Sequence, residues 1–263
     1  MMNILQNIVD NKKREVEEQK RIRTLSELES MPLFKRNCFS LTRFLLDNNR
    51  TGIIAEFKRR SPSKGVINDR SKVEEVTQAY AQHKASGISV LTDEHFFGGR
   101  LEDLKAARIN ELPLLRKDFI IDEYQIIEAK AFGADVVLLI AACLSRNDVL
   151  QLASLARSIG LEVLLEVHNE RELEFYCDQV DIIGVNNRDL SNLYVDIQIS
   201  LDLIDKIPLS VVPVTESGIS DIETVRILRK AGYKGFLMGE IFMKHKEPGD
   251  AFADFVQRLK AGL

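Results

Sequence analysis

Short apolar segments recur along most of the chain and alternate with segments of helical periodicity. The apolar segments are rich in Val, Ile and Leu, and each has the length of one buried strand. Eight of them occupy residues 52–57, 88–91, 112–119, 135–141, 162–167, 181–186, 210–217 and 234–240. This alternation constrains the fold more than any other feature, because near-continuous apolar strands followed by helices are typical of parallel sheets that helices cover.

The segments between the strands predict amphipathic helices. The clearest lie at residues 71–86, 123–132, 146–159, 196–207 and 221–230. Several helices run into a glycine just before the next strand, where glycine can adopt the left-handed conformation that ends a helix. These glycines are Gly87, Gly133, Gly160 and Gly232. Eight strand–helix units predict an α/β protein with a closed (β/α)8 barrel, the TIM barrel, although an open doubly wound sheet remains an alternative.

The first 48 residues differ from the rest, since they contain helical stretches at residues 4–23 and 41–47 but no strand pattern. We therefore expect an N-terminal helical extension at residues 1–48, packed on the barrel within one domain that spans residues 1–263. Basic residues gather at residues 12–23, as in a helix that binds a partner or a membrane. Three glutamates interrupt this stretch, namely Glu15, Glu17 and Glu18. The mixed charge favours a solvated helix face.

The overall charge excludes some classes of partner. Lys and Arg number 36 against 40 Asp and Glu, so the formal net charge is −4 and no broad basic field is available for nucleic acid.

The cysteines Cys38, Cys143 and Cys177 form no CxxC pair, which argues against a disulfide framework or structural zinc and favours the cytoplasm. The longest strongly apolar stretch, residues 136–143, is too short to cross a bilayer, and the N-terminus lacks the features of a secretory signal.

Ionisable and amide side chains stand where the predicted strands end. They are Glu56, Lys58, Lys117, Asp118, Glu166, Asn186, Asn187 and Arg188. In a (β/α)8 barrel the carboxyl ends of the strands form one mouth, where active sites are found. Alternation along the first strand places Ile54, Glu56 and Lys58 on one face, and pairs Leu164 with Glu166 in the same way, so these charges should point inward. Lysines and carboxylates in a partly dehydrated pocket are suited to proton transfer.

A metal site is not indicated by these residues. No HxH pair or carboxylate cluster has metal-ligand spacing. The histidines His83, His95, His168 and His245 stand in unrelated contexts, with His83 expected on a helix surface and His168 at the start of a loop. We expect no metal.

Two glycine turns near the end of the chain predict an anion site. TESGIS follows the seventh strand and LMGEIF the eighth, so Ser217, Gly218, Gly239 and Glu240 lie where a loop meets a helix. Barrels often bind phosphate there, through helix N-terminal N–H groups. The loop at residues 59–68 follows the first strand, and its Ser, Pro, Lys and Gly content suits a mobile lid.

These motifs closely resemble those of the indole-3-glycerol-phosphate synthase family. In order along the chain they are AEFKRRSPSKGVI, SVLTDEHFFGG, LLRKDFIID, LEVHNE, IGVNNRDL, TESGI and FLMGE. They cover nearly the whole barrel, and the first and third are specific to this family. The resemblance implies a carboxy-lyase of tryptophan biosynthesis that converts 1-(2-carboxyphenylamino)-1-deoxyribulose 5-phosphate to indole-3-glycerol phosphate, with loss of CO2 and water.

The resemblance also implies roles for individual residues. Lys117 matches the general acid that protonates the ketone oxygen while a ring carbon attacks the carbonyl carbon. Lys58, Glu166 and Glu56 are the matched candidates for the proton donor and base of the later steps, and their division of labour stays open. The residues matched to substrate orientation are Ser61, Asn186, Arg188, Glu216 and Ser217. Those matched to phosphate binding are Ser217, Gly218, Gly239 and Glu240.

The expected partner is one small phosphorylated anthranilate derivative. The resemblance implies no cofactor, since the electron-rich aniline ring supplies the nucleophile, and a monomer is our default expectation. Glu240 stands where some family members carry serine, so its backbone N–H is the expected phosphate contact, because a carboxylate would repel phosphate.

Two other classes of function are alternatives to this one. A phosphate-binding barrel such as phosphoribosylanthranilate isomerase would typically need a Cys near the first strand, but Glu56 and Lys58 stand there and none of the cysteines follows an early strand end. The tryptophan synthase α chain belongs to the same class of rivals. A barrel that binds a metabolite without chemistry should lack the charged residues of the mouth, which this chain keeps.

Overall fold

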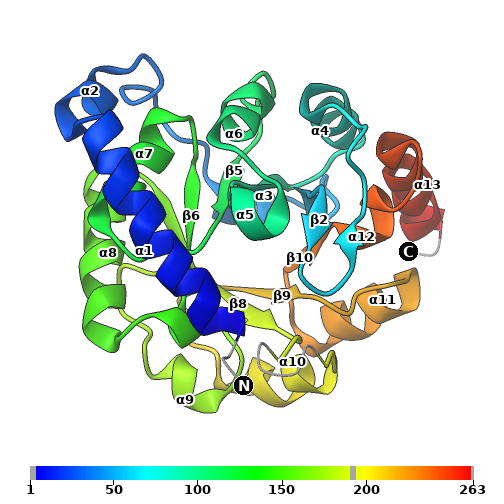
Figure 1. Ribbon diagram of the computed structural model, residues 1–263. Coiled ribbons are helices and arrows are strands. Elements are labelled where there is room, and N and C mark those ends of the chain that lie inside the picture. Colours follow the sequence, from blue (N-terminus) through cyan, green and yellow to red (C-terminus); the bar gives the residue numbers. More distant parts are fainter. Residues whose placement is uncertain (1–3, 190–193, 262–263) are drawn as a thin grey trace.

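The computed structural model describes residues 4–189 and 194–261. Eight parallel strands form a closed barrel in the order β1-β10-β9-β8-β7-β6-β5-β4 (Figure 1). They are β1 (Ile53–Phe57), β4 (Gly87–Leu91), β5 (Leu114–Lys117), β6 (Val136–Ile140), β7 (Glu162–Val167), β8 (Ile182–Asn186), β9 (Val212–Glu216) and β10 (Gly235–Met238). The predicted (β/α)8 barrel is thus confirmed, and closure between β1 and β10 excludes an open sheet.

Helices surround the barrel, as Figure 1 shows. The longer ones after β1 are α4 (Val73–Gln82), α6 (Leu101–Ala107), α7 (Glu123–Ala131), α8 (Arg146–Ser158), α10 (Gln198–Leu203), α11 (Ile222–Ala231) and α13 (Pro248–Ala261). Short turns of helix lie near the strand ends, namely α5 (Glu94–Phe97), η1 (Ala141–Cys143), α9 (Glu170–Leu173), η2 (Ile204–Lys206) and α12 (Glu240–Met243). In the described parts of the chain, no helix combines the length and apolar composition that a membrane crossing requires.

Three of the four predicted helix-ending glycines adopt a left-handed backbone. Gly133, Gly160 and Gly232 have φ of 92°, 83° and 129° and follow α7, α8 and α11. The prediction for Gly87 is wrong, because this residue begins β4 and Lys84 has the positive φ, 68°. A Cβ at Gly87 would lie 2.6 Å from a methyl carbon of Leu41, so glycine is needed there for close packing.

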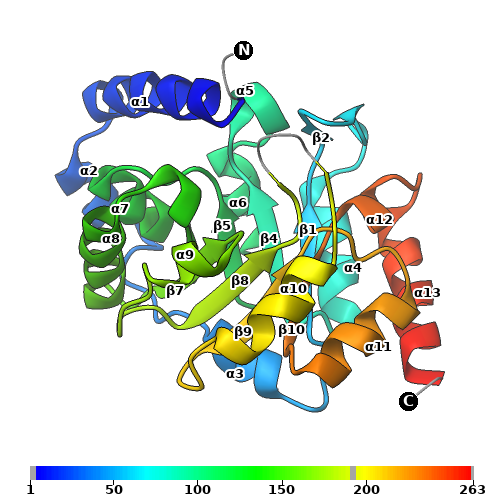
Figure 2. The same cartoon turned by 90° about the horizontal axis from the view of Figure 1, so that it is seen from below.

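The interior of the barrel is closed at its amino end by α3 (Leu41–Leu46). Leu41 and Leu45 pack in one cluster with inward residues of the strands, such as Ile54. Figure 2 places α3 at the end of the barrel opposite to α1 (Ile4–Ile22). The carboxylate of Glu162 holds α3 in position, since it accepts hydrogen bonds from the Ser40 and Thr42 hydroxyls at 2.6 and 2.7 Å.

Replacing Leu41 by alanine should destabilise the barrel. Leu41 is 1% exposed, and a buried Leu→Ala change costs about 2–5 kcal/mol because it removes apolar contacts and leaves a cavity. Leu46 lies on the same helix but is 56% exposed, so Leu46→Ala should change stability by no more than about 0.5 kcal/mol. Urea unfolding of both variants measures the difference. Equal losses of stability in the two variants would contradict the role of Leu41 in closing the amino end of the barrel.

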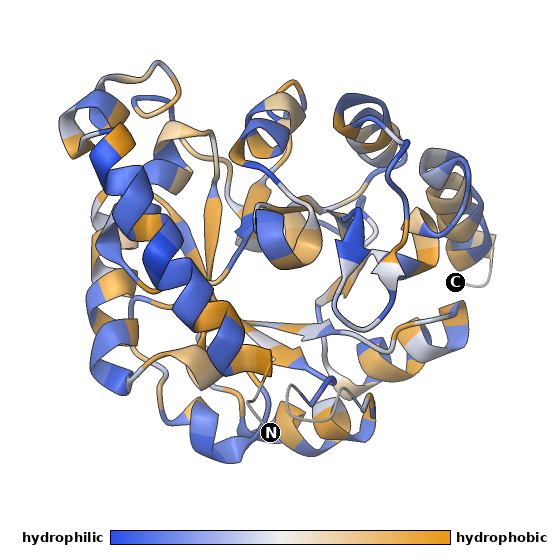
Figure 3. Cartoon of the chain, viewed as in Figure 1, coloured by the Kyte–Doolittle hydropathy of each residue, from blue (hydrophilic) through white to orange (hydrophobic). Residues whose placement is uncertain are grey.

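The N-terminal extension begins with α1 and α2 (Leu25–Ser30). In Figure 2, α1 lies across one end of the barrel, the same end at which α5 and the hairpin of β2 (Arg60–Ser61) and β3 (Gly65–Val66) stand. Figure 3 shows that α1 is mostly hydrophilic, with an apolar segment at its N-terminal end. Helix α1 therefore covers part of the barrel mouth.

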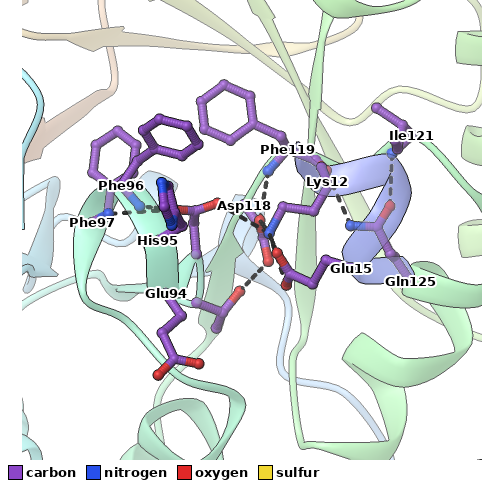
Figure 4. A network of polar contacts seen from close by, with 12 residues as sticks. Lys12, Glu15, Glu94, His95, Phe96, Phe97, Asp118, Phe119, Ile121 and Gln125 are labelled. Atoms are coloured by element: carbon purple, nitrogen blue, oxygen red, sulfur yellow. Dashed lines mark hydrogen bonds and ion pairs between the residues drawn. The ribbon is translucent and has the colours of Figure 1, made fainter. Parts of the chain in front are cut away.

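The prediction of a solvated face at residues 12–23 is wrong for one residue. Lys12 is 1% exposed, and its Nζ lies 3.1, 2.9 and 3.0 Å from carboxylate oxygens of Asp93, Asp118 and Glu15 (Figure 4). Burial lowers the pKa of Lys12, but these carboxylates raise it by more, so the ammonium stays charged. A buried lysine thus joins α1 to the loops that follow β4 and β5, whereas Lys13 beside it is 63% exposed.

Candidate active site

A pocket opens at the carboxyl ends of the strands, between α1, the β2–β3 hairpin and the loops after the strands. The structure brings every residue predicted for the site into its lining, namely Glu56, Lys58, Ser61, Lys117, Glu166, Asn186, Arg188, Glu216, Ser217, Gly218, Gly239 and Glu240. The strands position these side chains because alternate residues of each strand face the barrel interior. Asn187, next to Asn186, faces outward instead and hydrogen-bonds to the Thr215 hydroxyl at 3.1 Å.

Lys117 lies at the centre of the charged groups. Its Nζ donates a hydrogen bond to Glu166 Oε2 at 2.9 Å and lies 3.4 Å from Glu216 Oε2. Burial lowers the pKa of Lys117, but the charges of Glu166, Glu216 and Glu56 raise it well above its ordinary value. The side chain is therefore a positively charged proton donor held between the carboxyl groups of Glu166 and Glu216.

Glu166 is held in its ionised form. Its Oε2 accepts the hydrogen bond from Lys117. Its Oε1 accepts a hydrogen bond from Asn186 Nδ2 at 3.0 Å and lies 3.3 Å from His168 Nε2. Burial raises the pKa of Glu166, yet Lys117 and then His168 lower it by more, to well below its ordinary range. Both carboxylate oxygens thus have partners, and the group can act as an anion or a proton acceptor.

Glu216 has the opposite character. Its Oε1 is buried without a hydrogen-bond partner among the described residues. Burial raises the pKa of Glu216, and Glu166 and Glu56 raise it further against the opposing effect of Lys117, to about 8. The carboxyl group is therefore mostly protonated at neutral pH and is available as a hydrogen-bond donor or acid.

Gly184 makes room for Glu216, which sequence reasoning missed. A Cβ at this position in β8 would lie 2.4 Å from Glu216 Oε1 and 2.7 Å from Leu164 Cδ2. Glycine in the middle of a strand marks a close approach of this kind, and the IIGVN segment carries that signal. Any larger residue would displace the carboxyl group.

Glu56 and Lys58 form an ion pair at the end of β1. Glu56 Oε1 lies 2.6 Å from Lys58 Nζ, and both side chains line the pocket as the parity of the strand predicts. A Cβ at Gly239 would lie 2.7 Å from Glu56 Oε1, so a glycine after β10 is needed for the carboxylate to fit. Lys58 is less buried than Glu56, which leaves its ammonium accessible from the pocket.

The turns after β9 and β10 supply backbone amides. Ser217 and Gly218 both have left-handed φ, 63° and 75°, and Gly239 directly precedes α12. N–H groups in the first turn of a helix have no intrahelical partner and suit an anion. The Glu240 carboxylate lies 3.7 Å from Lys64 of the β2–β3 hairpin, so this cation offsets its charge.

Apolar side chains form another part of the pocket wall, which sequence reasoning missed. They are Ile4, Leu5 and Ile8 of α1 together with Leu91, Phe97, Phe119, Leu138 and Ile140. The rings of Phe97 and Phe119 lie 6.1 Å apart. Such a wall suits a flat aromatic group. The pocket therefore combines an apolar wall, a buried set of acids and bases, and the backbone amides of Ser217, Gly218, Gly239 and Glu240, which we call the anion cradle.

The sequence predicts His168 only at the start of a loop, whereas the structure places it beside Glu166. Its side chain is mostly buried and also contacts Glu172 Oε2 through Nδ1 at 3.0 Å. The inward parity of Leu164 and Glu166, extended by two residues, would have found it. In the described residues no three His, Cys, Asp or Glu side chains are placed to bind a metal ion.

Comparisons with known proteins identify the family. The sequence profile described as indole-3-glycerol phosphate synthase matches residues 5–255. A protein named indole-3-glycerol phosphate synthase from Bacteroides thetaiotaomicron is 46% identical, over 99% of this chain and all of that protein. One of the same name from Salinibacter ruber is 44% identical, over 99% of this chain and 96% of that protein.

Solved structures agree on the fold. A variant of the tryptophan synthase α-subunit from Pyrococcus furiosus superposes with a TM-score of 0.62, over 81% of this chain and 99% of that one. Its sequence is only 16% identical, so this likeness shows a shared barrel and no more. The profile and the close relatives decide the family: the chain is an enzyme that belongs to the indole-3-glycerol phosphate synthase family.

Proposed function

We propose that this chain is a carboxy-lyase that converts 1-(2-carboxyphenylamino)-1-deoxyribulose 5-phosphate to indole-3-glycerol phosphate in tryptophan biosynthesis. The observation that carries the proposal is the Lys117 ammonium, buried between Glu166 and Glu216 in a pocket with an apolar wall and an anion cradle. The apolar wall suits the anthranilate ring and the cradle suits the phosphate. The substrate would then extend from the apolar wall to the anion cradle, with its ketone beside Lys117.

The first chemical step is ring closure. The ring carbon that bears the carboxylate attacks the ketone carbon, and Lys117 gives its proton to the ketone oxygen as the new C–C bond forms. The bond to the carboxylate then breaks, CO2 leaves, and its electron pair restores the aromatic ring. Glu166 stays anionic beside Lys117 and stabilises the charged ammonium before the transfer.

The last step is loss of water. A donor protonates the new hydroxyl, the C–O bond breaks, and a base removes a proton from the neighbouring carbon of the new ring. We propose Lys58, Glu56 and Glu166 for these transfers, because all three line the pocket and Lys58 and Glu56 form an ion pair at 2.6 Å. The protonated Glu216 is a further donor at neutral pH.

Binding of the substrate involves both sides of the mouth. We propose that Ser61, Asn186, Arg188, Glu216 and Ser217 orient the substrate, and that the phosphate is bound by Ser217, Gly218, Gly239 and Glu240. At Glu240 the backbone amide is the contact, since its carboxylate is directed to Lys64. The chemistry needs no cofactor, because the aniline ring supplies the electron pair. We further propose that the chain acts as a monomeric, single-domain enzyme in the cytoplasm.

The function is tested with purified protein and the carboxyphenylamino-deoxyribulose phosphate. Appearance of indole absorbance together with stoichiometric release of CO2 is the expected result. Binding of the substrate without turnover would favour the metabolite-binding barrel instead. Turnover of phosphoribosylanthranilate without indole formation would favour the isomerase.

The rate should fall on the alkaline side as Glu216 ionises. Its pKa of about 8 means that a negative charge appears beside Lys117 above that pH, which makes the ammonium a weaker acid. We expect kcat/KM to fall as the pH rises through about 8, toward the lower value of the form in which Glu216 is ionised. Glu216→Gln keeps the group neutral and should remove this fall, whereas Glu223→Gln on the exposed face of α11 should retain it. An unchanged alkaline limb in Glu216→Gln would contradict the assignment.

A further inference from the structure

His168 lies between Glu166, which lines the pocket, and Glu172, which lies outside it. It follows directly after β7, and its Nε2 lies 3.3 Å from Glu166 Oε1. On the other side of the ring, Nδ1 lies 3.0 Å from Glu172 Oε2. The three side chains therefore form a row from α9 to the centre of the pocket. His168 is not in the pocket lining, so it reaches the pocket only through Glu166.

Glu172 is itself held in place by three contacts. Its Oε2 accepts the backbone N–H of His168 at 2.8 Å besides facing Nδ1, and its Oε1 accepts Asn169 Nδ2 at 2.8 Å. The Asn169 side chain also accepts the backbone N–H of Glu172 and so caps α9. A carboxylate on one nitrogen fixes the orientation of an imidazole and leaves the other N–H directed away from it.

The imidazole is positively charged in this setting. Burial lowers the pKa of His168, but Glu166 and Glu172 raise it to about 10. Both ring nitrogens then carry protons: Nδ1 is hydrogen-bonded to Glu172, whereas Nε2 forms an ion pair with Glu166 at 3.3 Å without a hydrogen bond. Glu166 consequently faces two cations, with Lys117 on Oε2 and His168 on Oε1.

This second cation matters at the moment of catalysis. When Lys117 gives its proton to the substrate, it becomes neutral, and Glu166 loses one of its two counter-charges. Without another cation, a buried carboxylate would be drawn toward protonation and could recapture the proton or turn away. The imidazolium remains through this step, because it donates no proton to the substrate. Asn186 on the same Oε1 adds a neutral hydrogen bond.

We propose that His168, oriented by Glu172, is a positioning residue that keeps Glu166 ionised and directed at Lys117 while Lys117 is neutral. The inference rests on the proposed function, since it assigns His168 a part in the same proton transfer. It makes His168 a part of the chemistry rather than of substrate binding. Loss of the contact should therefore lower kcat and leave KM nearly unchanged.

The test begins with His168→Asn, whose amide can reach toward Glu172 in place of Nδ1 but not toward Glu166. We expect kcat to fall by about 10- to 100-fold, as for other residues that orient an active group, with KM within about twofold. His168→Gln places an amide donor near the position of Nε2 and should recover part of the loss. Glu170→Gln on the same helix is the matched control, because Glu170 faces Lys206 at the surface and should leave kcat unchanged.

The pH profile separates this role from a structural one. Glu166 is faced by Lys117 from β5, Glu216 from β9, Cys143 from η1 and His168. Of the two cations among them, only His168 is removed in His168→Asn, so the acid limb of kcat/KM should move to higher pH as Glu166 protonates more readily. A variant that is merely less stable would lower activity without moving that limb.

A double variant gives an independent check. If His168 acts through Glu166, then His168→Asn should have no further effect on kcat in a Glu166→Gln background. If His168→Asn fails to fold, Glu172→Gln replaces it, because this change keeps the imidazole but removes the carboxylate that orients it and raises its pKa. The value of kcat should again fall, and the acid limb of kcat/KM should again move to higher pH.

The outcomes distinguish the two proposals. Absence of turnover in the wild-type protein would overturn the proposed function. Turnover in the wild type with unchanged kcat and an unmoved acid limb in His168→Asn and Glu172→Gln would overturn the role of His168 alone.

Discussion

Replacement of Lys117 by methionine should lower kcat by about 100- to 10,000-fold, the range expected when a positioned general acid is removed. Methionine fills a similar volume but carries no proton to donate. Removal of the ammonium also leaves the Glu166 carboxylate, 2.9 Å away, without this cation, whereas Glu216, 3.4 Å away, is already mostly protonated at neutral pH. The pKa of Glu166 should rise as a result. The fall in kcat would then have two causes, namely the missing acid and the altered ionisation of Glu166.

A second variant separates these two effects. Lys117→Arg keeps a positive charge near both carboxylates, but a guanidinium remains protonated up to about pH 12 or beyond and gives up its proton far less readily. If Lys117 is the acid, the arginine variant should lose activity nearly as completely as the methionine variant while it retains more of the stability of the wild type. If Lys117 serves only as a counter-charge, Lys117→Arg should retain most of the activity.

Steady-state kinetics with the carboxyphenylamino-deoxyribulose phosphate measure both variants. Lys13→Met, on the exposed face of α1, is the matched control and should behave as the wild type. Activity of Lys117→Met within tenfold of the wild type would exclude this lysine as the acid. The variants still contain the apolar wall and the anion cradle. Substrate binding should therefore persist, and it can be measured separately from turnover.

The barrel could be predicted from the sequence because each strand carries its own signal. Runs such as residues 136–140 are apolar throughout, and the parity of Ile54, Glu56 and Lys58 depends only on the geometry of a single strand. The strand-end positions then converge because closure of the barrel brings all carboxyl ends to one mouth. Local pattern and general barrel geometry were sufficient for this part of the site.

Features that depend on contacts between distant segments could not be predicted in this way. The requirement for glycine at Gly87 arises from Leu41, which is far away in the chain. The space for Glu216 depends on Gly184 in the neighbouring strand. Burial of Lys12 depends on carboxylates that only the folded barrel brings to α1, and within the helix sequence it resembles any other lysine.

The buried Lys12 leads to the second prediction with a large expected effect. Lys12→Met should lower the free energy of unfolding by about 3–5 kcal/mol, because the change removes the shared cation of a buried ion cluster and leaves Asp118 with Arg116 as its remaining cation. Asp93 and Asp118 are both fully or nearly fully buried. Lys13→Met should change stability by no more than about 0.5 kcal/mol, because Lys13 is 63% exposed. Urea unfolding at pH 7 measures both.

The pH dependence of the loss identifies its cause. Burial raises the pKa of Asp118, but Lys12 and then Arg116 lower it by more, to below its value in the unfolded chain. The ionised form therefore stabilises the folded state above the unfolded pKa of about 4, and this contribution disappears as the pH falls through the folded pKa. In Lys12→Met the pKa of Asp118 should rise, and protonation would relieve the unpaired charge. The difference from the wild type should accordingly be smaller at pH 4 than at pH 7.

A rescue variant shows whether charge is responsible. Asp93 Oδ1 accepts the backbone N–H groups of Phe96 and Phe97 and so caps α5, while its Oδ2 faces Lys12. Asp93→Asn can keep the capping oxygen and remove the charge, so adding it to Lys12→Met should restore part of the lost stability. If the double variant is no more stable than Lys12→Met, loss of packing rather than unpaired charge would account for the effect.

The same substitution links stability to the pocket. Ile4, Leu5 and Ile8 line the pocket from α1, and Lys12 lies one turn beyond Ile8. If the ion cluster is what holds α1 over the mouth, Lys12→Met should loosen this wall and raise KM by more than it lowers kcat, because the acids and bases of the strands stay in place. Limited proteolysis should then cleave within α1 before the barrel unfolds. A normal KM together with an intact α1 would show that the other contacts of α1, such as the 2.7 Å pair of Lys20 with Asp122, are sufficient to hold the helix.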